Sequence, residues 1–140
     1  MWLELFFVLW AVLLGLDIPW VLLNTRFGIY RGWVNGVITN RAVVGVLWIL
    51  ISGLMALCIT GIARYFPLKM IISAAVIFGF TVYFIFNATS LAMFQWSVWS
   101  ALGDTLWGSV LCGIAGTVAW ALVQKWLIVD PAVVNPAALP

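Results

Sequence analysis

Four long runs of apolar residues dominate the chain, over residues 3–23, 42–63, 70–94 and 100–123. The hydrocarbon core of a bilayer is about 30 Å thick, and an α-helix needs about 20 apolar residues to cross it. Because backbone polar groups cannot stay unpaired in lipid, runs of this length should be helices. The pattern predicts an all-α, integral membrane four-helix bundle, with residues 1–140 as a single transmembrane domain.

The segments between the runs predict how the helices are connected. Residues 24–41 form the longest connection, and its apolar positions recur at steps of three and four, as in a short interfacial helix between helices 1 and 2. An irregular loop is the alternative. The other two connections are short, which implies antiparallel neighbours. Three prolines in residues 130–140 predict an extended C-terminal tail that could pack on a partner.

Four spans place both termini on the same side of the membrane, which we call side X; the opposite side is Y. Three basic residues fall on each side: Arg26, Arg31 and Arg41 on Y, and Arg64, Lys69 and Lys125 on X. The excess of positive charge that normally marks the cytoplasmic side is therefore missing, and the orientation stays open.

Composition narrows the class of protein. Hydrophobic residues make up 66% of the 140 residues and charged residues only 7%, for a net charge of +2. Soluble domains carry about 25% charged residues. A soluble enzyme, a disordered segment and a nucleic-acid binder are therefore excluded. Tryptophans near the span ends fit the aromatic belt at the lipid headgroups, whereas two others lie deeper and should pack between helices. The belt set is Trp2, Trp20, Trp33, Trp96, Trp99 and Trp126, and the deeper pair is Trp107 and Trp120.

Polar side chains inside the spans are few, and three of them share a depth. Asp17, Asn87 and Asp104 each lie roughly 6–10 Å inside the Y boundary, at a rise of 1.5 Å per residue. We therefore predict one polar intramembrane cluster in the Y leaflet. Its predicted members are Asp17, Asn87, Asp104, Arg41, Thr89 and Ser90, with Thr105 and Asn24 as further partners.

Two interpretations of this cluster compete. In one, a carboxylate binds and releases a proton or an ion, as in a small transporter. In the other, the polar groups form a hydrogen-bonded clamp that fixes helix packing. The X-side halves of the four helices are nearly free of polar groups. A site open to one leaflet does not transport, so the pattern favours the clamp.

The last apolar run carries small residues at four-residue spacing: Gly108, Cys112 and Gly116. Such a stripe lets a neighbouring helix approach closely, either within this chain or in another chain. Residues 17–20 and 104–107 also share the pattern D-x-x-W. Two matches over four residues are too few to establish a repeat.

Several kinds of site are not expected. The chain has no histidine, and its two cysteines lack metal-binding spacing. We therefore predict no metal site, no cofactor and no catalytic residues. The absence of histidine argues against strongly ligated chlorins, but a lipid or a pigment between the helices stays open.

Four segments together resemble the DUF2177 family of small four-span membrane proteins. They are Asp17-Ile18-Pro19-Trp20, Tyr30-Arg31, residues 83–92 and Gly103-Asp104-Thr105-Leu106-Trp107-Gly108. The resemblance covers roughly residues 5–120. Asn87 departs from it, because the family more often has an aspartate there, and this weakens an acid-based mechanism. The family occurs in bacteria and in some large DNA viruses, so the resemblance leaves both a cellular and a virion membrane open. It brings no established activity.

These observations favour a non-catalytic membrane protein. We expect it to be a structural or accessory subunit of a larger membrane assembly. Its expected partners are the lipid bilayer and other membrane protein subunits. The alternative is a small transporter or proton-conducting protein that uses Asp17 and Asp104. A membrane enzyme ranks third, because two aspartates could bind Mg²⁺ but no phosphate-binding motif accompanies them.

Overall fold

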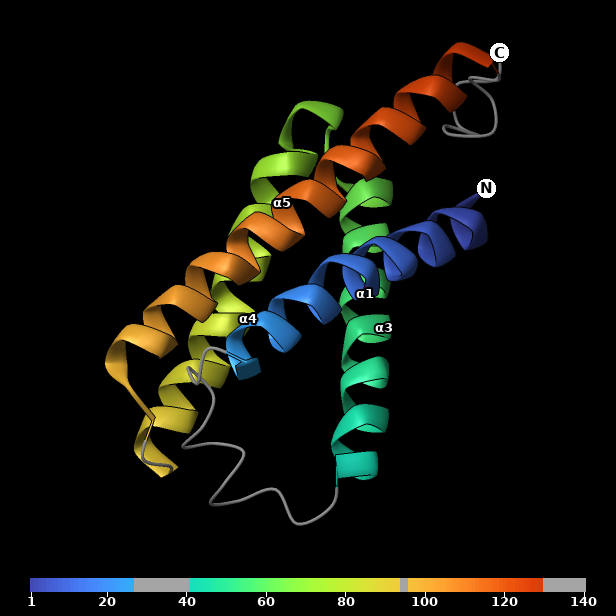
Figure 1. The fold of residues 1–140 in the computed structure, drawn as a ribbon. Coiled ribbons are helices and arrows are strands. Elements are labelled where there is room, and N and C mark those ends of the chain that lie inside the picture. Colours follow the sequence, from blue (N-terminus) through green and yellow to red (C-terminus); the bar gives the residue numbers. More distant parts are fainter. Residues whose placement is uncertain (27–40, 94–95, 130–140) are drawn as a thin grey trace.

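The computed structural model describes residues 1–26, 41–93 and 96–129, without the side chains of residues 25, 41–44 and 129. The expected interfacial helix and the tail over residues 130–140 lie outside these ranges. The described chain forms four long helices and one 3₁₀ turn (Figure 1). Their bounds are α1 Trp2–Arg26, α3 Arg41–Tyr65, η1 Leu68–Met70, α4 Ile71–Met93 and α5 Val98–Val129.

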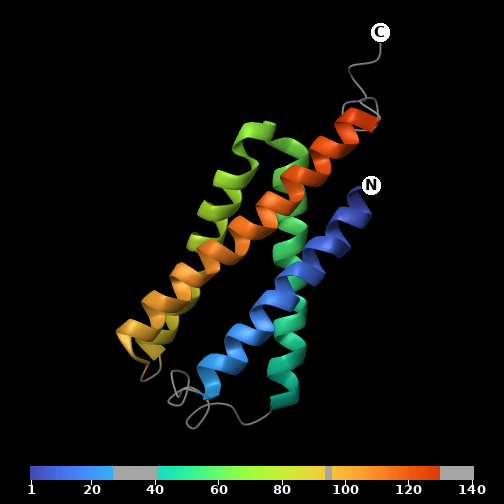
Figure 2. The ribbon, with the colours of Figure 1, turned by 45° about the horizontal axis from the view of Figure 1, so that its top comes forward.

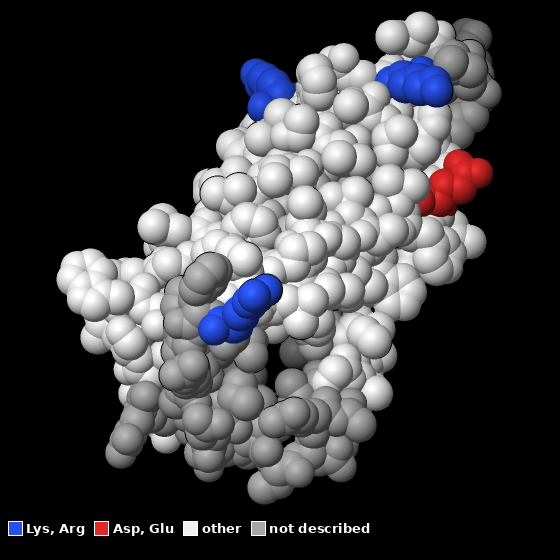
Figure 3. All heavy atoms as spheres, in the orientation of Figure 1, with Lys and Arg blue, Asp and Glu red and all other residues white. Residues whose placement is uncertain are grey.

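Each of the four helices contains a stretch long and apolar enough to cross a membrane, which confirms the predicted all-α, multi-pass membrane fold. Exposed charged side chains lie towards the ends of the described helices, with Glu4 in the first turn of α1 and Arg64 in the last turn of α3. On the face drawn in Figure 3, the basic and acidic atoms lie in a few separate places with a broad uncharged surface between them. Large apolar side chains such as Leu54 and Ile77 point outwards. Lipid is the solvent that such a surface requires.

The helices run alternately between the two ends of the bundle. The start of α1 and the end of α5 lie at the same end, which we call the X end (Figures 1 and 2). The tight connection between α3 and α4 is also there; Pro67 precedes η1, and the amide of Met70 donates to the Pro67 carbonyl at 2.7 Å. The X-end half of the core is mostly apolar and includes Leu5, Leu9 and Ile59, all fully buried.

The closest helix pair is α4 and α5, which lie antiparallel and side by side (Figures 1 and 2). Glycines make this approach possible. A Cβ at Gly79 would lie 2.6 Å from Cys112 Cβ, and one at Gly116 would lie 2.6 Å from Ala75 Cβ. Helix α1 packs on α3 and α5. Its Trp10 lies over Gly53 and donates to the carbonyl of Ile49 at 3.2 Å.

Candidate functional site

The carboxylate of Asp17 is the point where all four helices meet. Asp17 lies on α1 and is only 5% exposed. Its Oδ2 accepts a hydrogen bond from the Trp48 indole of α3 at 2.8 Å. Its Oδ1 accepts from the Trp107 indole of α5 at 2.9 Å and from the Tyr83 hydroxyl of α4 at 3.4 Å. Indole N–H groups can only donate, so an acceptor-only carboxylate suits them.

A second aspartate–tryptophan hydrogen bond joins α1 and α5, with the donor on α1 and the acceptor on α5. The Trp20 indole of α1 donates to Asp104 Oδ1 of α5 at 3.1 Å. The rings of Trp20 and Trp107 stack, with centroids 4.6 Å apart and an interplanar angle of 10°. Each tryptophan therefore bonds the aspartate of the other helix while the two rings face each other.

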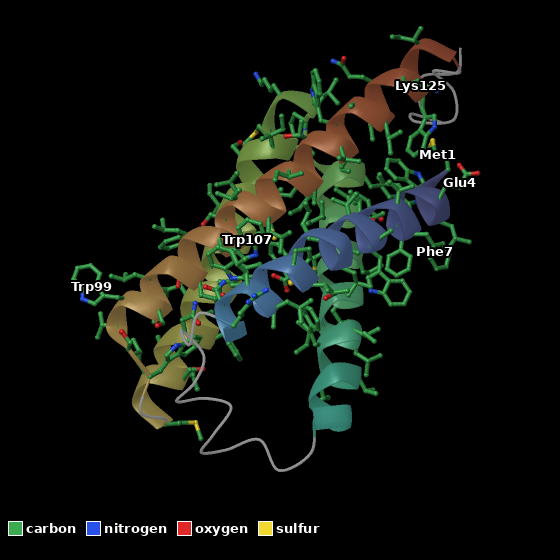
Figure 4. All side chains as sticks on the ribbon, viewed as in Figure 1. Met1, Glu4, Phe7, Trp99, Trp107 and Lys125 are labelled. Atoms are coloured by element: carbon green, nitrogen blue, oxygen red, sulfur yellow. The ribbon has the colours of Figure 1, made fainter. Side chains whose placement is uncertain are left out.

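The local sequence explains this arrangement. Residues three apart on a helix share a face, so each D-x-x-W segment presents its aspartate and its tryptophan to the same neighbour. Helices α1 and α5 run antiparallel, so the tryptophan of each segment reaches the aspartate of the other. We call Asp17, Trp20, Asp104 and Trp107 the D-x-x-W clamp. Figure 4 labels Trp107 near the middle of α5.

A smaller polar contact joins α4 to α5 beside the clamp. Asn87, 2% exposed, donates through Nδ2 to Thr105 Oγ1 at 2.9 Å. The Thr105 hydroxyl in turn donates to the carbonyl of Ala101 at 2.8 Å. Asn87 Oδ1 is buried and accepts no hydrogen bond within the described ranges. Thr105 thus acts as acceptor and donor at once, and it links the amide to the α5 backbone.

Only part of the predicted cluster lies in the interior of the bundle. Asp17, Asn87, Asp104 and Ser90 are all buried. Thr89 is exposed and donates to the Ile85 carbonyl of its own helix, so its predicted place in the cluster is wrong. One residue turns a helix by about 100°, which explains why Ser90 faces inwards and Thr89 does not.

The two remaining residues of the predicted cluster are Asn24 and Arg41. Asn24 is buried but bonds the carbonyl of Trp20 at 2.8 Å, one turn back on the same helix. The Arg41 side chain lies outside the described residues.

The small-residue stripe on α5 faces α4 within the chain. A Cβ at Gly108 would meet the Tyr83 side chain, with Tyr83 Cβ at 2.7 Å. Cys112 is fully buried against Gly79, and Gly116 contacts Ala75. The stripe therefore seats Tyr83 against α5, where its hydroxyl reaches Asp17.

Sequence reasoning missed three of the donors, Trp20, Trp48 and Tyr83. The position of Trp20 near a span end predicts a place in the headgroup belt, but the structure places its side chain inside the clamp. The D-x-x-W pattern that residues 17–20 and 104–107 share is the sequence feature that could have predicted this role of Trp20. Trp48 carries no comparable signal, because its partner depends on how α3 is rotated against α1.

Comparison with known protein families is consistent with this architecture. A family model described as a predicted membrane protein, DUF2177, matches residues 2–121. The chain belongs to the DUF2177 family. The resemblance drawn from the short motifs is thereby confirmed over most of the chain. Neither the curated proteins nor the solved structures that were searched gave a match to this DUF2177 protein.

All residues of the clamp fall within the range that defines the DUF2177 match. Across the described segments of this DUF2177 protein, no three His, Cys, Asp or Glu side chains are grouped so as to hold a metal ion. The side-chain hydrogen bonds of this site run from indole, phenol and amide donors to carboxylate and hydroxyl acceptors. These groups hold helices together.

Proposed function

We propose that this DUF2177 protein is a non-catalytic structural or accessory subunit of a membrane assembly, and that its intramembrane carboxylates serve to clamp its own helices. The observation that carries the proposal is the Asp17 carboxylate, which accepts one donor from each of α3, α4 and α5. A carboxylate with this many donors is suited to holding a fixed geometry.

The core between the clamp and the X end supports a structural role over a transporting one. Leu5, Leu9 and Leu13 follow Asp17 towards that end, and each is 0–1% exposed. Two nearby polar groups of α3, Ser52 and Thr60, donate to carbonyls of their own helix. A proton path needs a chain of exchangeable polar groups, and the described core offers an apolar plug there.

The subunit role draws support from the shape of the chain. The described residues form helices with apolar outer faces and no domain outside the membrane. We infer that both termini lie on the same side of the membrane, because the start of α1 and the end of α5 lie at the same end of the bundle. A small bundle of this kind has its outer faces available for lipid and for other membrane subunits.

The clamp role is tested by proton flux in liposomes. We compare wild type with Asp17→Asn and Asp104→Asn, and use Thr89→Val, on the exposed face of α4, as the matched control. We expect flux equal to that of empty liposomes for all four proteins. Wild-type flux that either aspartate variant abolishes would establish the transporter alternative and overturn the clamp role.

The subunit role is tested by native mass measurement after gentle extraction from the membrane of origin. We expect stoichiometric membrane partners. A lone monomer or homodimer, recovered under conditions that preserve other complexes of that membrane, would contradict the subunit role and leave the clamp untouched.

A further inference from the structure

A pocket of about 330 Å³ lies at the X end, far along α5 from the clamp. Ala63, Ile71 and Val123 line it, and all three are buried. Arg64 and Phe66 line it as well, and both are exposed. The pocket therefore has a buried apolar lining and an exposed edge to which one arginine contributes. Its size is at the lower end of the range of about 300–1,000 Å³ for ligand pockets.

The Arg64 guanidinium is oriented by aromatic rings. Its Cζ lies 5.3 Å from the ring centroid of Tyr65 and 5.8 Å from that of Trp2. A guanidinium held over ring faces keeps its planar N–H fork for a further partner. The one ion pair among the described residues joins the N-terminal amine to Glu4, so no described carboxylate neutralises Arg64.

The pocket lies at the level where the spans end. The α3 span ends at Tyr65, and the next span begins at Leu68. Lys69 and Lys125 lie towards this end of the bundle as well; Lys125 is labelled in Figure 4, and basic atoms occupy this region of Figure 3. A ligand here meets positive charge at the headgroup level and apolar side chains just below it.

We propose that this pocket binds an anionic phospholipid. Its phosphate lies against the Arg64 guanidinium, and the glycerol and the first part of one acyl chain lie over Ile71 and Val123. Arginine suits phosphate because its N–H fork can donate two parallel hydrogen bonds. Basic pockets between transmembrane helices are known to bind anionic headgroups. The volume admits part of a lipid, and the rest of the acyl chain continues along the outer apolar surface.

The test is lipid retention by the full-length protein in detergent, measured by native mass spectrometry. Dioleoyl phosphatidylglycerol and dioleoyl phosphatidylcholine are titrated separately. Arg64→Gln removes the phosphate ligand, and Leu127→Trp fills the pocket from its half-buried edge while Arg64 stays. Lys69→Gln is the matched control, because it removes one positive charge from the same end without lining the pocket.

We expect wild type to bind phosphatidylglycerol more tightly than phosphatidylcholine. Arg64→Gln should weaken phosphatidylglycerol binding by about tenfold or more, the factor expected when a charge-assisted hydrogen bond is lost. Leu127→Trp should weaken it as well, and Lys69→Gln should leave it within about twofold of wild type.

Three results would overturn the proposal. Equal losses in Arg64→Gln and Lys69→Gln would indicate diffuse attraction to the whole X end. Unchanged binding in Leu127→Trp, with the wild-type circular dichroism spectrum, would show that the lipid does not enter the pocket. Displacement of the lipid by millimolar inorganic phosphate would identify a small-anion site in place of a lipid site.

Discussion

Removing the Asp17 side chain tests most sharply whether an intramembrane carboxylate stabilises this fold. Asp17→Ala leaves the indoles of Trp48 and Trp107 and the hydroxyl of Tyr83 without their common acceptor. Asp17→Asn is more selective. The two indoles bond different carboxylate oxygens, and an amide keeps only one oxygen, so its NH₂ group must face one indole N–H.

The magnitude follows from the number and length of the bonds. Hydrogen bonds inside membrane proteins contribute about 0.6 kcal/mol on average and about 1.7 kcal/mol at most. Three bonds therefore give about 2–5 kcal/mol, and the 3.4 Å bond from Tyr83 favours the lower half of this range. We expect Asp17→Ala to lower the free energy of unfolding by about 2–4 kcal/mol, and Asp17→Asn by about half as much.

The opposing effect is the desolvation of a buried charge, which can exceed the gain from its partners. If desolvation prevailed, both variants would be as stable as wild type or more stable. Unfolding in mixed micelles by increasing dodecyl sulfate, followed by far-ultraviolet circular dichroism, distinguishes the two cases. Thr89→Val is the control and should change stability by less than about 0.5 kcal/mol, because its hydroxyl bonds only its own helix on an exposed face. An Asp17→Ala protein as stable as wild type would refute the reasoning.

Four further substitutions, at Gly108, Gly103 and Thr105 of α5, probe the packing of α5 against α4 in the same assay. Gly108→Ala should destabilise the protein by about 1–3 kcal/mol, because the new methyl group meets Tyr83 and forces the helices apart. Gly103→Ala, where no described atom lies within 4 Å of the new methyl group, should be neutral or gain up to about 1 kcal/mol; equal losses at both glycines would contradict this packing. Thr105→Val should cost about 1–3 kcal/mol, because it leaves the buried Asn87 amide without its acceptor, whereas Thr105→Ser should stay close to wild type. A valine variant as stable as the serine variant would remove the role given to the hydroxyl.

The fold could be predicted from the sequence because one physical constraint dominates it. The chain has 66% hydrophobic residues, arranged in four long runs. In lipid, such runs must form helices, because a helix pairs its own backbone polar groups. The described residues form four long helices, as expected. The sequence also predicts that Asp17 and Asp104 lie at a similar depth in the membrane, because the rise per residue of a helix converts residue number directly into depth.

Which side chains meet could not be predicted in the same way. Contact depends on the rotation and crossing of helices, and these follow from side-chain packing across the whole bundle. Thr89 and Ser90 lie at nearly the same depth, but only Ser90 is buried, so depth alone could not separate the residue that faces the interior from the one that does not. Trp20 fits a headgroup position by its place in the span, and only its stacking on Trp107 reveals its role.

If the two D-x-x-W segments hold α1 against α5 as one unit, Trp20 and Trp107 must be energetically coupled. The most direct measurement is a double-mutant cycle of unfolding free energies with Trp20→Leu, Trp107→Leu and the double variant. Each single variant loses its own hydrogen bond and the shared ring stack, whereas the double variant loses the stack only once. We predict a coupling free energy of about 0.5–1.5 kcal/mol, the range for stacked aromatic pairs. Losses that add to within about 0.3 kcal/mol would show that the two tryptophans act independently, and they would contradict the clamp.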